Sequence, residues 1–260
     1  MNPVLIGIMA SLFYLISSTL RQFNLDHSRL NAKTLGSIAI ALHGISIYPV
    51  ILTQSGINLG FFPVLSLVAF TIALVLFIFS LKKPVDNLFS IVFGFAVFAI
   101  VLSLALPSEA PPRQYAAPMA SHILLSILAL GFFIVSALQA VLLAFQNTRL
   151  KKKQLAIKGL PPIQTIESLM FQMITIGMVL LTLSIITGFF FIEDFFAQHL
   201  AHKTSFALTS WVVFSVLLWG RYQQGWRGPT AVRWTLGGFA LLMLAYFGVK
   251  LVLEFILQRF

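Results

Sequence analysis

Long apolar runs alternate with short polar gaps along the whole chain. Most runs approach the roughly 20 residues that a helix needs to cross about 30 Å of hydrocarbon. They lack the two-residue alternation of a membrane β-strand, and backbone groups in lipid must bond within their own segment. We therefore predict eight transmembrane helices: Pro3–Leu20, Thr34–Thr53, Val64–Leu81, Asn87–Leu106, Ser121–Phe145, Leu169–Phe191, Thr204–Trp219 and Trp234–Phe255.

Composition supports the same fold class. Of the 260 residues, 59% are hydrophobic and only 9% are charged, whereas a soluble domain needs about a quarter charged residues. The first run has no basic region before it and no clear small-residue cleavage site, so we expect a retained helix instead of a signal peptide. The predicted fold is an all-α polytopic integral membrane bundle forming one domain over residues 1–260.

The basic residues set the predicted topology. The net charge is +10, but most Lys and Arg residues lie in the gaps after the first, third, fifth and seventh runs. The positive-inside rule then places both termini, and the gaps at 107–120 and 192–203, on the outer (periplasmic) side. This distribution favours the bilayer as partner over nucleic acid, and it indicates a multi-pass protein of a bacterial inner membrane.

Two histidines lie within apolar runs, where an ionisable side chain is costly and is a functional candidate. His43 shares a helix face with Gly36, Ala39 and Ser46, so we expect it to point inward with room beside it. His122 lies above a face of small residues, Ser126, Ala129, Ser136 and Ala140. A structural hydrogen bond across the bundle is the alternative role for either ring.

The second half of the chain carries motifs that resemble the cytochrome c assembly family of haem-handling membrane proteins, CcsA, CcmC and CcmF. The matching positions are Thr187-Gly188, Lys203-Thr204, Ser210-Trp211, Arg221 and Gly225-Trp226-Arg227-Gly228. The layout is most similar to a short CcsA-like branch, with the core most recognisable at 119–256. The family's tryptophan-rich loop has no Trp here; Phe195, Phe196 and His202 stand roughly in its place.

The resemblance implies a binding site for b-type haem near the outer leaflet. His122 stands at the place of the family's external haem ligand and His43 at that of a transmembrane histidine, so both are predicted axial ligands of the haem iron. His202 and Lys203 would meet the propionates, and Trp211 would form an apolar wall. One haem with both ligands, one haem with one ligand, and two sites all remain open, and Trp211 and His202 have plain packing and loop roles as alternatives.

The function predicted from this resemblance is to hold, relay or sense haem, without catalysis. Because the tryptophan-rich loop lacks Trp, we do not expect the protein to attach haem to apocytochromes. The sequence also shows no motif of known catalytic residues. The alternative is an accessory subunit of a membrane transporter, such as CNNM-type magnesium/cobalt efflux, with the fold as scaffold. Another membrane protein, either a cytochrome c maturation component or a cation transporter, is therefore an expected partner. A permease and a divalent-cation site at Glu193, Asp194, His199 and His202 are weaker alternatives.

Overall fold

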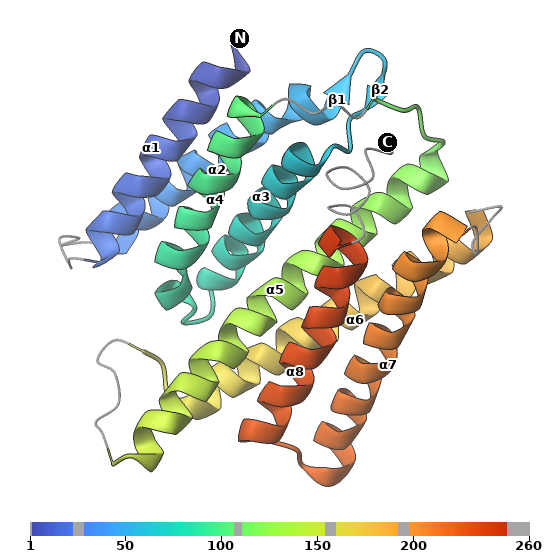
Figure 1. The fold of residues 1–260 in the computed structure, drawn as a ribbon. Coiled ribbons are helices and arrows are strands. Elements are labelled where there is room, and N and C mark those ends of the chain that lie inside the picture. Colours follow the sequence, from blue (N-terminus) through green and yellow to red (C-terminus); the bar gives the residue numbers. More distant parts are fainter. Residues whose placement is uncertain (1, 23–28, 107–110, 154–159, 192–197, 249–260) are drawn as a thin grey trace. The chain divides into compact units, whose positions relative to one another are not determined.

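The computed structural model describes residues 2–22, 29–106, 111–153, 160–191 and 198–248, with the side chains of 22–31 and 191–202 excluded. These residues form two compact units, Met1–Tyr115 and Ala116–Leu257. Both are built from helices (Figure 1). We describe each unit by itself.

The first unit is a four-helix arrangement in which each long helix packs on two others: α1 on α2 and α4, and α3 on α2 and α4. A 3₁₀ turn, η1, leads into α4, and a short hairpin follows α2. The elements are α1 (Pro3–Gln22), α2 (Arg29–Ile51), β1 (Leu52–Thr53), β2 (Gly56–Ile57), α3 (Phe61–Ser80), η1 (Asp86–Leu88) and α4 (Phe89–Ala105).

Helix α1 shows why these sequences form membrane helices with one packed face. Leu5, Ile8 and Leu12 recur at helical spacing and are more than half exposed, which suits contact with acyl chains. On the opposite face Ala10 and Tyr14 are fully buried. Apolar exposure on this scale is what a lipid-facing helix requires, and it would be a liability in water.

A backbone bridge ties the hairpin to the segment that precedes the second unit. Ile57 and Arg113 exchange two backbone hydrogen bonds, at 2.8 and 3.1 Å. Gly56 permits this approach, because a Cβ there would lie 2.4 Å from the Arg113 carbonyl oxygen. Residues 111–116 of the 107–120 gap are thus non-helical around this bridge, and residues 117–120 already belong to a helix.

The second unit also has four long helices, with α5 packed on α6 and α8, and α7 packed mainly on α8. Its centre is a stacked pair of rings, Phe133 and Phe214, with centroids 4.2 Å apart. Gly238 of α8 lies against Phe214 and leaves no room for a larger residue. The elements are α5 (Ala117–Lys151), α6 (Ile163–Phe191), α7 (Gln198–Gln224), α8 (Gly228–Met243) and the π-helical turn η2 (Leu244–Gly248).

The helical bundle confirms the predicted fold class. Seven helices in the described part of the chain are long and apolar enough to cross a membrane, and α7 forms an eighth long helix of more polar composition. Helix α5 extends beyond the predicted span to Lys151, because its basic end continues the helix past the apolar run. The orientation of the termini and the single-domain assignment stay predictions.

Candidate functional site

His43 lies at the centre of the first unit and joins three helices. Its side chain is fully buried, with Nε2 3.0 Å from the Ser66 hydroxyl of α3 and Nδ1 3.4 Å from the Tyr14 hydroxyl of α1. Phe70 lies edge-on to the ring, with centroids 5.6 Å apart. Both ring nitrogens therefore face protein hydroxyl groups, which is how a structural buried histidine is satisfied.

Aromatic rings fill the room that was expected beside His43. Phe93 packs against Gly36, where an added Cβ would lie 3.1 Å from its ring. Phe70 packs against Gly44 at the same distance. The small residues of α2 thus admit rings from α4 and α3 instead of a ligand.

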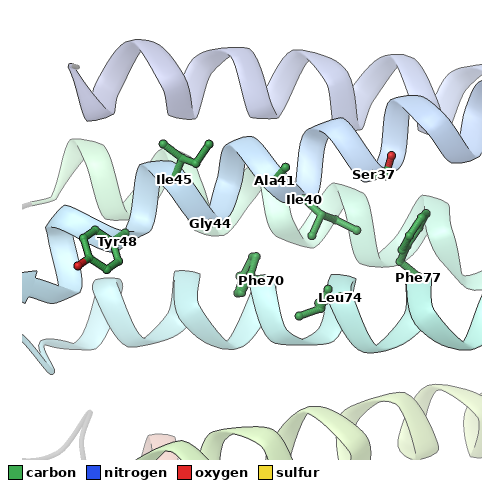
Figure 2. Close-up of a pocket in the computed structure, with 9 residues that line it drawn as sticks. All are labelled: Ser37, Ile40, Ala41, Gly44, Ile45, Tyr48, Phe70, Leu74 and Phe77. Atoms are coloured by element: carbon green, nitrogen blue, oxygen red, sulfur yellow. The ribbon is translucent and has the colours of Figure 1, made fainter.

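An open groove of about 570 Å³ lies between α2 and α3 in the first unit (Figure 2). In that view Phe70, Leu74 and Phe77 project from α3 toward α2, and Tyr48 lies at one end. No lining residue is a histidine or carries a charge. The groove therefore has the volume of a small-molecule site, and its described lining has no imidazole and no charged side chain.

The chemistry is concentrated in the second unit, around His122 at the start of α5. Its Nδ1 lies 2.8 Å from the backbone carbonyl oxygen of Ser184 in α6. A carbonyl only accepts, so Nδ1 carries the proton and donates, which leaves the lone pair of a neutral ring on Nε2. No hydrogen-bond partner of Nε2 is found among the described side chains.

A cavity of about 80 Å³ adjoins this imidazole. Polar groups gather in it beside His122: the Ser126 and Ser184 hydroxyls are 2.6 Å apart, and the Lys203 ammonium lies 5.6 Å from the Tyr246 ring centroid. Helices α5 and α6 form one wall, and α7 with η2 forms the other. The lining residues are His122, Ser126, Leu181, Ser184, Ile185, Lys203, Thr204, Ala207, Leu208, Ala245 and Tyr246.

The side chains that line this cavity suit haem, but the cavity itself is small. An imidazole that gives its second N–H to a carbonyl is the usual arrangement of a histidine that binds a metal, and Lys203 supplies a cation for a carboxylate. About 80 Å³ is well below the roughly 300 Å³ at which small-molecule pockets begin. The cavity would therefore hold the ligand atom and an acidic edge, with the macrocycle extending beyond it.

The other predicted site residues have separate positions. Trp211 donates its indole N–H to the Thr182 hydroxyl at 2.9 Å, tying α7 to α6, and it does not line the cavity. Lys203 lines the cavity beside His122. The side chains of His199 and His202, like Glu193, Asp194 and Lys250, lie outside the described residues. His43 and His122 belong to different units, so a shared haem stays a prediction.

A charged clamp joins α6 to the turn between α7 and α8. The Arg221 guanidinium donates to Glu167 at 2.7 Å and to the Trp226 carbonyl oxygen at 3.2 Å. The second Glu167 oxygen accepts the backbone N–H of Gly228 at 3.1 Å. Gly228 has a φ of 54°, a left-handed conformation that favours glycine. One buried carboxylate therefore holds both a helix end and the start of the next helix.

The family model described as Cytochrome C assembly protein matches residues 32–257. The chain belongs to the cytochrome c assembly protein family. It is 37% identical over 223 residues to the inner membrane protein YpjD of Escherichia coli K12, covering 84% of this chain and 85% of that relative.

Two cytochrome c biogenesis proteins are also similar to the chain, at lower identity. The chain is 24% identical over 180 residues to the cytochrome c biogenesis protein CcsA of Prochlorococcus marinus MIT 9515, covering 60% of this chain and 58% of that one. With CcsA of Chlamydomonas reinhardtii it shares 24% identity over 193 residues, or 72% and 52% of the two chains. No solved structure matches.

Within this family member, the motif of Arg221 and Gly225-Trp226-Arg227-Gly228 is a structural element. Trp226 lies over Gly220, where an added Cβ would lie 2.4 Å from the indole ring, and it packs on Trp234 with centroids 5.3 Å apart. The sequence interpretation missed Glu167, which completes the clamp. The sequence did indicate this residue, because Glu167 is a lone carboxylate beside an apolar run and such a charge needs a partner.

Proposed function

We propose that this protein binds b-type haem through His122 and holds, relays or senses it. The observation that carries the proposal is the hydrogen bond from His122 Nδ1 to the Ser184 carbonyl, which leaves the lone pair of the imidazole on Nε2 beside a cavity. Haem iron takes such a nitrogen as an axial ligand and would supply ligand-binding and redox chemistry there. Membership of the cytochrome c assembly family supports the same assignment.

The rest of the cavity supports haem over a bare metal ion. Leu181, Ile185 and Leu208 give an apolar lining beside the imidazole, and Lys203 gives a cation for the acidic edge of the macrocycle. No group of three or more metal-ligating side chains occurs among the residues that the structure describes. The chain has no Cys, so it offers no thiol for covalent attachment and the haem would be of the b type.

We place this site on the outer side of a bacterial inner membrane, in a binding protein without catalysis. The positive-inside distribution of Lys and Arg supports the outer position of His122. YpjD, the relative at 37% identity, is described as an inner membrane protein. A site near the outer surface suits delivery to or withdrawal from a partner on that side.

Ferric haem titration of the purified protein in detergent tests this function. We expect saturable binding with a Soret band in the wild type and at least a roughly tenfold loss of affinity in His122→Ala, because the axial ligand is gone. Added imidazole should restore the band in His122→Ala by filling the position of the deleted ring.

His43→Ala is the matched histidine control. We expect it to keep the Soret band, because both nitrogens of His43 already face hydroxyl groups. Loss of the band in His43→Ala together with its retention in His122→Ala would overturn the assignment. A wild type that never shows a Soret band after haem titration would reject haem binding altogether.

A further inference from the structure

One wall of the cavity beside His122 comes from a π-helical turn at the end of α8. Helix α8 is regular from Gly228 to Met243, and the chain then forms this turn from Leu244 to Gly248. Such turns are frequent at functional sites. Ala245 and Tyr246 lie within the turn and line the cavity.

Tyr246 and His122 line the same cavity, together with two serines. The Ser126 hydroxyl lies 2.6 Å from that of Ser184. The backbone oxygen of Ser184 accepts the His122 N–H. The phenol and the imidazole therefore belong to one cavity whose polar groups include the lone pair of His122 Nε2.

Around Tyr246 the cavity is lined by a positive charge and by hydroxyl groups that can donate hydrogen bonds. Lys203 lies over the Tyr246 ring with its ammonium 5.6 Å from the centroid, and Thr204 adds a hydroxyl. Among the residues that the structure describes, no Asp or Glu lines the cavity, and Lys203 has no ion pair. A cation together with hydroxyl donors is a complementary set for an acid.

We propose that Lys203 and Tyr246 form a carboxylate-binding subsite that recognises the acidic edge of a porphyrin whose iron faces His122. Lys203 contributes charge, and the Tyr246 hydroxyl contributes a hydrogen-bond donor. The inference rests on the proposed haem function and assigns Tyr246 a role in ligand specificity. The neutral diester of the same porphyrin would lose the charge interaction, and its carbonyl oxygen would accept only a weaker hydrogen bond than a carboxylate does.

The test compares three porphyrins on the full-length protein in detergent: haem, haem dimethyl ester and metal-free protoporphyrin IX. We expect Tyr246→Phe, which keeps the ring and loses the hydroxyl, to weaken the binding of both free acids about tenfold. Lys203→Gln should do the same, and both variants should have a much smaller effect on the affinity for the dimethyl ester. His122→Ala should weaken the two iron porphyrins and leave metal-free protoporphyrin unaffected.

Tyr48→Phe is the matched control, because Tyr48 is exposed in the first unit and does not line the cavity of His122; it should leave all three affinities unchanged. Equal effects of Tyr246→Phe on acid and ester, or no effect on either, would overturn the subsite while His122-dependent haem binding stands. Tyr246-dependent binding of metal-free protoporphyrin without His122-dependent haem binding would reject only the iron site. Absence of all porphyrin binding would reject both.

Discussion

Replacing Glu167 by Gln should destabilise the second unit by about 2–3 kcal/mol. The change removes the negative charge from a side chain that is 10% exposed and leaves Arg221, 25% exposed, without its ion-pair partner at 2.7 Å. Removing one partner of a fully buried pair costs about 3–5 kcal/mol, and the partial exposure of Arg221 lowers that figure. The new amide also points an N–H group at one of two existing donors, Arg221 or Gly228.

Reversible unfolding of the purified protein in mixed micelles of rising SDS fraction measures this loss. Tryptophan fluorescence is a suitable signal, because the backbone carbonyl of Trp226 accepts a hydrogen bond from Arg221 and its indole ring packs on Trp234. The double variant Glu167→Gln/Arg221→Met should be less destabilised than the sum of its single variants, since it removes the unpaired charge as well.

Asp86→Asn provides a matched acid-to-amide control. Its ion pairs with Arg21 and Lys33 are long, at 3.5 and 3.6 Å, and its side chain is 30% exposed, so the loss should stay below about 1 kcal/mol. If Glu167→Gln cost no more than Asp86→Asn, or if the double variant were simply additive, the clamp would not hold the helices as described.

Two further substitutions test the packing. His43→Leu should destabilise the first unit by about 2–4 kcal/mol, because it leaves the Tyr14 and Ser66 hydroxyls unpaired, and an unchanged SDS unfolding midpoint would contradict this. Gly238→Ala should cost about 1–3 kcal/mol, since the new methyl would lie 2.9 Å from the Phe214 ring. Gly237→Ala, with nothing within 4 Å of its added Cβ, should be neutral or stabilising, and equal effects of the two glycine changes would refute this packing.

The sequence was sufficient for the fold class because hydrophobic runs report directly on helices in lipid. It also placed His122 and Lys203 as candidates, and the structure brings them to one cavity. It could not supply the partners of His43, since Tyr14 and Ser66 come from other helices and only tertiary packing brings them to the ring.

Tyr246 illustrates a different limit of sequence reasoning. An ordinary α-helical projection of the last apolar run assigns it no special position, whereas in the structure it lies in a π-helical turn and lines the cavity. The charge of Glu167 beside an apolar run indicated that it needs a partner. Its pairing with Arg221, 54 residues away, depends on how α6 packs against the turn after α7. In both cases local geometry at a helix end determined the outcome.

The central claim is that His122 ligates haem iron, and a pyridine haemochrome assay on protein purified from haem-replete cells tests it most directly. We predict the spectrum of non-covalent haem b at about one haem per wild-type chain, and a loss of most of that haem from His122→Ala of equal fold and yield. Equal haem content in the two proteins, or none in the wild type, would contradict it.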